Sequence, residues 1–392
     1  MPCLNEALTL PGCIANARET LAVMKQKLGL TGEILIADNN STDDTAAIAE
    51  AAGARVVPVT ARGYGNCLIG GFQAANGRFL VMGDADGSYD FRDAVAMVEQ
   101  LLADNDICMG TRLKGRIMPG AMPFKNRYLG NPVLSGIVKL LFGWRLSDAH
   151  CGLRALSKRA FDRLQLSSEG MEFASEMVIK AALLEMKTTE VPVTLHPDKR
   201  NRPPHLRPWR DGWRHLRYIL MLAPGALFLW PAAILGLVTL TLATLILLLG
   251  NGMHLGGLIL GPHWLIMACT GAIVSHNLFL FGLAATLYGV THAYRKPSAA
   301  SRVIARTSSL ETMMFTGLAL IVAGVSGILA IALNWIAIDF ASPNKIPQLV
   351  ASCAILIIGL QHFFGGFLLG IVGGNRADFR QAGTSLPSKN HP

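Results

Sequence analysis

Hydrophobic residues are distributed unevenly along this chain. Its first half has short apolar runs between charged residues, whereas no Asp, Glu, Lys or Arg occurs from Tyr218 to Tyr294. A membrane-spanning helix needs about 20 mainly apolar residues. Four stretches meet this requirement, at 226–249, 264–291, 312–335 and 348–373. The pattern predicts a polar globular part followed by an all-α membrane part of four helices.

Apolar runs in the polar part alternate between helical and strand-like spacing. The expected order is a helix at 10–28, a strand at 33–37, a helix ending near 52, a strand at 55–59, a helix ending near 75 and a strand at 79–82. This alternation is typical of an α/β domain with a mostly parallel sheet, where ligands bind beyond the carboxyl ends of the strands. Asp38, the loop 63–65 and Asp84 all fall at such ends.

The turn after the last of these strands carries two carboxylates one residue apart, Asp84 and Asp86. Mg²⁺ and Mn²⁺ prefer oxygen ligands, and one or two carboxylates commonly hold them together with substrate phosphates. The turn therefore predicts a Mg²⁺ or Mn²⁺ site that binds a nucleoside diphosphate. For an isolated Asp-x-Asp pair, a solvated surface turn is the more common alternative.

Composition supports a membrane protein. Mean hydropathy is +0.39 and 51% of the residues are hydrophobic, too many for an ordinary soluble protein of this size. The seven cysteines show no zinc-binding spacing, so we expect reduced and mostly buried thiols. The net charge is +9, and basic residues gather beside the first apolar stretch. This position favours lipid headgroups or phosphates over nucleic acid as binding partners.

The junction before the first span has an amphipathic pattern. Seven basic residues and one acid lie between Lys199 and Arg217. Apolar residues 209, 213, 216 and 220 recur at helical spacing, opposite arginines 210, 214 and 217. We expect a helix over 209–224 that lies in the headgroup layer, with a solvated linker as the alternative.

Loop charges predict the orientation in the membrane. Basic residues lie between the second and third spans and after the fourth, namely Arg295, Lys296, Arg302, Arg306, Arg376 and Arg380. The other two connections contain only Lys345. The positive-inside rule then puts the polar part, the middle loop and the tail 376–392 in the cytoplasm. Two Gly-x-x-x-Gly patterns, 366–370 and 370–374, suggest close helix contact within one chain or between two, so a homo-oligomer stays open.

Six short motifs in the polar part carry a resemblance to a known family. They are Pro2-Cys3-Leu4-Asn5-Glu6, Asp38-Asn39-Asn40-Ser41-Thr42-Asp43, Asp84-Ala85-Asp86, Gly110-Thr111-Arg112, Asp148 to Ala155 and Met171 to Met177. In this order they resemble family 2 glycosyltransferases with the GT-A fold, in the branch of dolichyl-phosphate mannosyltransferases and polyprenyl-phosphate glycosyltransferases. The resemblance implies a Rossmann-like GT-A domain at 1–208, the amphipathic helix at 209–224, four transmembrane helices within 225–375 and the tail.

The resemblance also assigns roles around the nucleotide. It implies that Asp38 contacts the base and that Asp84 and Asp86 hold the metal on the donor pyrophosphate. The predicted nucleotide-sugar contacts are Pro2, Leu4, Glu6, Asp38, Gly65 and Asp84, and Asp86 is also counted as catalytic. Relatives usually place a full apolar strand before Pro2. We therefore expect apolar residues upstream of Met1, since without that strand mid-sheet backbone groups beside the pocket would be unpaired.

Acceptor binding requires cations. Planar guanidinium groups engage phosphate bidentately, and the candidates are Arg112, Arg127, Arg154 and Arg202, with Arg154 first and also predicted to be catalytic. Glu172 and Glu176 lie four apart on an expected helix. We expect one of them, Glu176 by preference, to orient substrate or metal. The alternative is that both are charges on the helix surface. A phosphate monoester is mostly dianionic at neutral pH, so its attack requires no strong base.

The predicted function is transfer of a hexose from a nucleoside diphosphate sugar, of the UDP-glucose or GDP-mannose class, to a polyprenyl or dolichyl phosphate with inversion. A processive polysaccharide synthase is the nearest alternative. It is disfavoured because four spans leave little room for a polymer channel and no Gln-x-x-Arg-Trp motif occurs. A noncatalytic membrane protein that binds nucleotide sugar or lipid carrier is the other alternative, and the intact Asp84 and Asp86 argue against it.

Overall fold

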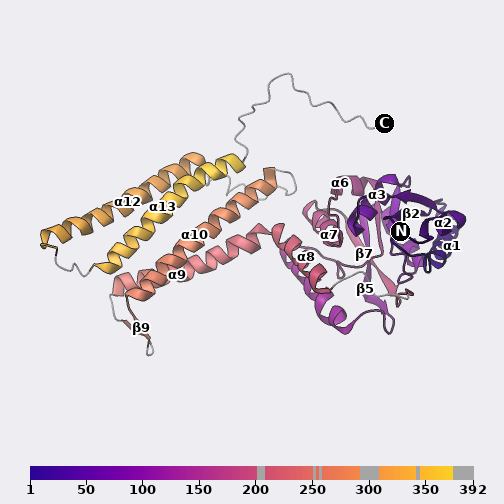
Figure 1. The fold of residues 1–392 in the computed structure, drawn as a ribbon, viewed down its shortest axis with the longest axis horizontal. Helices are drawn as coiled ribbons and strands as arrows, with labels where there is room; N and C mark the ends of the chain where they lie inside the picture. The colour runs from indigo at the N-terminus through magenta and orange to yellow at the C-terminus, as the bar shows by residue number, and fades with distance from the viewer. Residues whose placement is uncertain (201–207, 250–252, 256–257, 292–308, 341–344, 374–392) are drawn as a thin grey trace, which may run out of the picture. The chain divides into compact units, whose positions relative to one another are not determined.

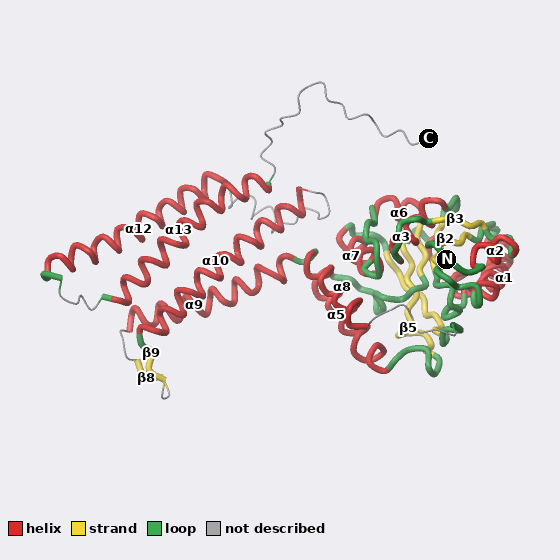
Figure 2. Tube along the Cα trace, in the orientation of Figure 1, coloured by secondary structure: helices red, strands yellow, loops and turns green. Residues whose placement is uncertain are grey.

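The computed structural model describes residues 1–200, 208–249, 253–255, 258–291, 309–340 and 345–373. The chain divides into two compact units, Met1–Ala223 and Pro224–Pro392. The first contains strands among helices, and the second is mainly helical (Figures 1 and 2). This agrees with the predicted α/β domain followed by an all-α membrane domain.

The first unit alternates strands and helices as expected. Its elements are β1 (Pro2–Cys3), α1 (Leu10–Leu28), β2 (Leu35–Asp38), α2 (Thr45–Ala51), β3 (Arg55–Pro58), α3 (Tyr64–Ala74), β4 (Phe79–Met82), η1 (Phe91–Asp93), α4 (Ala94–Leu102), β5 (Ile107–Ile117), η2 (Asn126–Gly130), α5 (Asn131–Phe142), β6 (Arg154–Ser157), α6 (Lys158–Leu164), α7 (Phe173–Leu183), β7 (Thr188–Leu195) and α8 (Pro208–Met221). In Figure 2 the strands lie in the middle of the unit with helices around them.

The strands form two sheets. One has the order β1-β2-β3 and is parallel throughout; the other has the order β4-β6-β5-β7. In the second sheet β5 and β7 are parallel, but β6 runs antiparallel to both of its neighbours. Because β6 is antiparallel to β4, its first residue Arg154 lies opposite Met82, the last residue of β4. The turn before β6 and the acidic turn after β4 therefore lie at the same end of these two strands.

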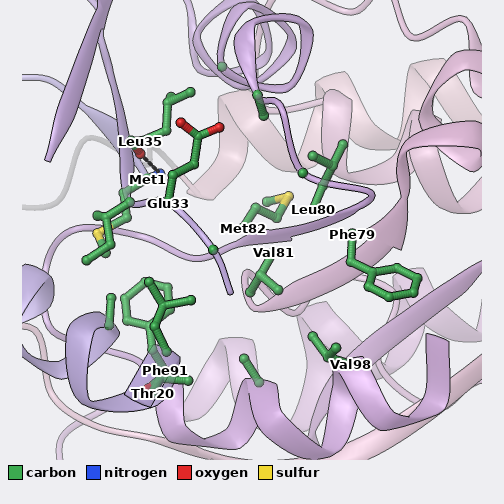
Figure 3. A pocket seen from close by; sticks show the side chains of 18 of the residues that line it. Met1, Thr20, Glu33, Leu35, Phe79, Leu80, Val81, Met82, Phe91 and Val98 are labelled. Atoms are coloured by element: carbon green, nitrogen blue, oxygen red, sulfur yellow. Dashed lines mark hydrogen bonds between the residues drawn. The ribbon is translucent and has the colours of Figure 1, made fainter. Parts of the chain in front are cut away.

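A mainly apolar cavity of about 440 Å³ lies between the two sheets. All four residues of β4 line it, as do Leu35 and Ala37 of β2. Figure 3 shows Met1 beside Leu35 on one side of the cavity and Phe79 to Met82 on another. The Met1 amine donates a hydrogen bond to the Leu35 carbonyl oxygen over 2.8 Å. The polar side chains in the lining are Thr20, Thr31, Glu33 and Arg78, and none of Asp38, Asp84 and Asp86 belongs to it.

The second unit contains four helices that are long and apolar enough to cross a membrane, spanning Gly225–Leu248, Pro262–Thr291, Leu310–Ala337 and Ile346–Val372. Its elements are η3 (Gly225–Leu229), α9 (Trp230–Leu249), β8 (Met253–Leu255), β9 (Leu258–Leu260), α10 (Pro262–Thr291), α12 (Leu310–Ala337) and α13 (Ile346–Val372). Within this unit α9 packs on α10, and α13 packs on both α10 and α12. Of the loop charges behind the predicted orientation, Lys345 alone belongs to the described ranges.

Glycines allow α12 and α13 to approach closely, and one of them, Gly366, belongs to the predicted patterns, since a Cβ there would lie 2.9 Å from the Met313 Cβ. A Cβ at Gly324 would lie 2.7 Å from the Leu356 backbone nitrogen, and one at Gly359 would lie 2.7 Å from the Ile321 nitrogen. At Gly370, the centre of both predicted Gly-x-x-x-Gly patterns, a Cβ would meet nothing within 4 Å. Gly324, Gly359 and Gly366 therefore all contribute to the close contact of the two helices, and Gly374 lies outside the described residues.

We predict that Gly324→Ile lowers the thermal unfolding midpoint of the detergent-purified protein, because the new side chain would force α12 away from the α13 backbone. Overpacking of this kind costs about 1–3 kcal/mol or more. Gly370→Ile is the matched control and should leave the midpoint unchanged. Equal destabilisation by both variants would contradict the proposed packing.

Candidate active site

The acidic turn after β4 is partly buried and held in place from several elements. The Tyr64 hydroxyl of α3 donates to Asp84 Oδ1 over 2.9 Å. Burial and the neighbouring Asp86 carboxylate raise the pKa of Asp84 to about 6. Below that pH a cation at Asp84 would have to displace a proton, so cation binding strengthens as the pH rises through 6. The other oxygen, Oδ2, faces Gly152, where an added Cβ would lie 2.7 Å away.

Asp86 is buried beside Glu6 and Arg200. Its Oδ1 accepts a hydrogen bond from the Ser88 amide at 2.9 Å, and its Oδ2 lies 2.5 Å from Arg200 Nη2. Arg200 Nη1 lies 3.1 Å from Glu6 Oε1. The structure thus brings together two predicted site residues, Glu6 and Asp86, through an arginine that we did not predict as a site residue. Its sequence signals were membership of a basic segment and, with Lys199 and Arg202, a position where members of the resembled family have a basic loop that closes over substrate.

The N-terminal motif is joined to the acidic turn. The Thr9 hydroxyl donates to the Ala85 carbonyl oxygen over 2.7 Å, and its side chain makes no capping bond to α1. Thr9 stands at the N-cap position of α1, but its hydroxyl is used across the site. Pro2 pairs with β2, and Leu4 is 37% exposed.

Asp38 ends β2 with one carboxylate oxygen unused by the described part of the chain. Oδ1 is buried and has no hydrogen-bond partner among those residues, while Oδ2 accepts from the Ser41 amide at 3.3 Å. A buried acceptor of this kind suits a donor group on a ligand, such as the N–H of a base. The next residue, Asn39, holds the neighbouring loop, since its Oδ1 accepts from the Gly63 amide over 2.9 Å.

Gly65 packs against the chain itself. A Cβ at this position would lie 1.9 Å from the Ser168 carbonyl oxygen, and the Gly65 amide donates to the Glu169 carbonyl oxygen over 2.8 Å. The glycine therefore allows α3 to contact residues 168–169. The geometry gives a reason for this glycine that does not involve the nucleotide.

Arg112 is engaged in a buried ion pair. Its Nε and Nη2 donate to the two oxygens of Asp148 over 2.7 and 2.9 Å, and Asp148 is fully buried. Burial alone would raise the pKa of Asp148, but the Arg112 guanidinium outweighs it and lowers that pKa. Asp148 also accepts from the His150 amide at 3.2 Å. Arg112 thus orders the turn before β6.

Arg154 is also committed to that turn. It is 1% exposed and donates to the carbonyl oxygens of Cys151 at 2.8 Å, Ala174 at 3.0 Å and Ala149 at 3.2 Å. These bonds tie β6, the turn and α7 together. The predicted phosphate contact gains no support from this conformation, in which the guanidinium is shielded by backbone.

The other two predicted phosphate ligands lie elsewhere or outside the described residues. Arg127 belongs to η2, where its guanidinium carbon lies 5.3 Å from the centre of the Tyr128 ring. Phe124 and Tyr128 are 76% and 60% exposed. Arg202 falls in the range 201–207 and is not described. Of the three described arginines, Arg112 and Arg154 are thus bonded to the turn before β6, and Arg127 lies against Tyr128.

Glu176 supports a loop. Its carboxylate is fully buried, accepts from the amides of Ser167 and Ser168, and pairs with Lys180 over 2.7 Å. Burial would raise the pKa of Glu176, but Lys180 and these amides lower it. Glu172, at the N-cap of α7, has a buried Oε2 with no partner within the described ranges. Of the two acids, Glu172 is the less constrained.

A histidine pair links the turn to α8. His150 Nε2 lies 3.3 Å from the Ser175 hydroxyl, which is 2.8 Å from His215 Nδ1. Burial and the nearby His215 lower the pKa of His150 to about 3, so it is neutral at physiological pH. The neutral imidazole of His150, close to the Ser175 hydroxyl, therefore has a structural role. The face of α8 that packs on the unit carries Asp211, His215 and Ile219, whereas Trp213 is 60% exposed.

The turn offers two carboxylates to a divalent cation. Among the residues that the structure describes, no group of three or more His, Cys, Asp or Glu side chains is placed to hold a metal ion. A Mg²⁺ or Mn²⁺ ion at Asp84 and Asp86 would therefore take further ligands from phosphate or water, as such ions commonly do. The carboxylate donors, the open Asp38 oxygen and the small Gly152 are compatible with a nucleotide diphosphate and a cation.

Comparison with known proteins gives consistent matches. Residues 1–165 match the model of glycosyl transferase family 2, and residues 283–373 match that of the family 2 C-terminal transmembrane region. The low-salt glycan biosynthesis hexosyltransferase Agl6 of Haloferax volcanii is 34% identical over 378 residues, 95% of this chain and 88% of that protein. An undecaprenyl-phosphate 4-deoxy-4-formamido-L-arabinose transferase of Sodalis glossinidius is 28% identical over 200 residues, 49% and 57% of the two chains. Among solved structures, glucosyl-3-phosphoglycerate synthase from Mycobacterium tuberculosis with Mn²⁺ and UDP is similar, with 21% identity, a TM-score of 0.43 and coverage of 56% of this chain and 76% of that chain.

We predict that Gly152→Ala weakens Mn²⁺ binding by roughly tenfold or more, because the methyl group would displace the Asp84 carboxylate and disturbed ligand orientation has that order of effect. Gly152 is not in the left-handed backbone region, so the effect is steric. Binding is measured by the paramagnetic resonance signal of free Mn²⁺. Gly136→Ala is the control, since a Cβ there meets nothing within 4 Å. Unchanged affinity in Gly152→Ala would argue against a metal at Asp84.

We also predict that Asp148→Asn destabilises the first unit by about 3–5 kcal/mol, because it leaves the Arg112 cation buried and unpaired. The double variant Arg112→Met/Asp148→Leu should lose less than either single variant. Chemical denaturation, monitored by tryptophan fluorescence, measures the free energy of unfolding of each variant. Since the folded pKa of Asp148 is lowered, this stabilisation exists above its unfolded pKa of about 3.9 and disappears as the pH falls through the folded value. Additive losses in the double variant would contradict a buried pair.

Proposed function

Because the chain belongs to the family 2 glycosyltransferases, we propose that it transfers a hexose from a nucleoside diphosphate sugar to a polyprenyl phosphate. The observation that carries the proposal is that the N-terminal motif is hydrogen-bonded both to the loop after Asp38 and to the turn that carries Asp84 and Asp86, in a chain with four apolar helices. A soluble donor and a lipid-borne acceptor require a pocket of this kind on a membrane protein.

The donor side of the proposal uses the described residues. Asp38 Oδ1 would accept a hydrogen bond from the base, and Asp84 and Asp86 would hold a divalent cation against the pyrophosphate. The cation, when bound, would act as a Lewis acid that stabilises the charge of the departing nucleoside diphosphate. Tyr64 orients Asp84, and the Ser88 amide orients Asp86.

The acceptor side needs little from a base. A polyprenyl phosphate is mostly dianionic at neutral pH and can attack the anomeric carbon directly, with inversion in a single displacement. This suits a site in which Glu176 is occupied by loop amides and Lys180, and His150 is neutral. Arg127 and Arg202 remain candidates for the acceptor phosphate, and Glu172 for substrate orientation.

The membrane part supports the choice of acceptor. Four apolar helices anchor the chain. Trp213 and Met221 of α8 are 60% and 65% exposed, and Arg217 is also exposed. A helix with exposed apolar and basic side chains suits the headgroup layer, where a lipid phosphate lies. We propose that the catalytic unit and the C-terminal tail are cytoplasmic, as the loop charges predict.

The test is an assay of membranes containing the protein with a panel of radiolabelled donors that includes UDP-glucose and GDP-mannose, together with Mn²⁺ and a polyprenyl phosphate. We expect a sugar-labelled lipid with one donor class. Asp84→Asn should reduce the rate by at least about a hundredfold, because one of two charged metal ligands is lost. Chelation should abolish the product. If nucleotide sugar binds but no donor gives labelled lipid, the acceptor class is wrong.

A further inference from the structure

A short segment after β7 is aligned with the acidic turn. The His196 amide donates to the Ser88 carbonyl oxygen over 2.8 Å, and the Lys199 amide donates to the Asp86 carbonyl oxygen over 3.0 Å. These two backbone bonds hold residues 196–200 beside residues 86–88. They deliver the Arg200 side chain to the predicted metal ligand.

Arg200 bridges two buried acids. Its guanidinium reaches Asp86 Oδ2 at 2.5 Å and Glu6 Oε1 at 3.1 Å. The side chain of Arg200 is 16% exposed, and those of Asp86 and Glu6 are 9% and 8% exposed. Charges this well shielded from water interact strongly. Removing the guanidinium would take away a positive charge that both carboxylates contact.

The Arg200 guanidinium is less completely bonded than that of Arg112. Arg112 grips both oxygens of one carboxylate with parallel bonds. Arg200 contributes one nitrogen to each of two buried acids, with Asp198 Oδ2 more distant at 3.9 Å from Nη2, and its Nε is buried with no hydrogen-bond partner among the described residues. A buried donor without a partner carries a desolvation cost. The position of Arg200 is therefore set mainly by charge, which another cation can supply.

We propose that Arg200 is the resident counter-ion of the donor pocket, which neutralises Asp86 and Glu6 until a divalent cation displaces its guanidinium from Asp86 Oδ2. The inference rests on the proposed function, from which it takes the cation site. Mg²⁺ bonds to oxygen at about 2.1 Å. A guanidinium hydrogen-bonded to the same oxygen competes for its lone pairs and repels the ion. Cation binding therefore exchanges one positive charge for another and releases Arg200.

The experiment measures Mn²⁺ binding to the full-length protein in detergent, without nucleotide, by the resonance signal of free Mn²⁺. Arg200→Gln should bind Mn²⁺ roughly tenfold more tightly or better, because a charge-assisted hydrogen bond no longer competes. The Mn²⁺ affinity of Arg200→Lys should lie between those of the wild type and Arg200→Gln, since a lysine ammonium cannot contact both acids as a planar guanidinium does. Arg163→Gln is the matched control. Arg163 is half-exposed, pairs with Asp106 at 3.6 Å, and should give wild-type affinity.

The double variant Asp84→Asn/Asp86→Asn sets the background. If the wild type binds Mn²⁺ above this background and Arg200→Gln binds it equally or more weakly, the counter-ion role is wrong while the metal site stands. If neither the wild type nor Arg200→Gln exceeds the background, the metal site of the proposed function fails, and the inference fails with it. Thermal unfolding midpoints verify that each variant is folded. Should Arg200→Gln not fold, the affinity of Arg200→Lys decides between the outcomes.

Discussion

Buried negative charge at the turn after β4 is the constraint on which the rest of the catalytic unit depends. Asp84 and Asp86 are one residue apart and partly or wholly shielded from water, so their mutual repulsion must be offset. The Ser88 amide of the turn itself does this together with two groups from other parts of the chain, the Tyr64 hydroxyl and the Arg200 guanidinium. The same turn is joined to the N-terminal motif through Thr9. Compensation of this charge gathers segments far apart in sequence.

Part of this arrangement follows from sequence because ligand-binding loops of an α/β domain follow the carboxyl ends of its strands. Runs of apolar residues predicted β2 and β4 within a few residues, and therefore the places of Asp38 and Asp84 at strand ends. The direction of β6 was not predictable in the same way. It runs antiparallel, so that Arg154 begins a strand beside Met82 and does not lie on an open loop. Strand direction depends on the whole sheet, and a four-residue apolar run does not specify it.

The sequence did not predict which groups pair with the buried charged side chains. Residue type and motif position suggested phosphate for Arg112 and substrate or metal for Glu176. The structure gives them Asp148, 36 residues away, and the amides of Ser167 and Ser168. Helix α8 shows the same limit. Its helical spacing was predicted, but its buried face includes Asp211 and His215, polar residues that a hydrophobic pattern assigns to solvent. Tertiary hydrogen bonds, such as that of His215 with Ser175, make that burial acceptable.

These partners change what an arginine substitution in this site can establish. Arg112 and Arg154 both hold residues 148–151, and the next residue, Gly152, faces Asp84. Removing either guanidinium would unpair buried acceptors and shift the turn toward the metal ligands, so activity would fall whether or not the arginine touches phosphate. Loss of activity alone therefore does not identify a phosphate ligand here. A phosphate contact requires a change in acceptor affinity at unchanged stability and unchanged Mn²⁺ binding, a condition that an arginine committed to the turn is poorly placed to meet.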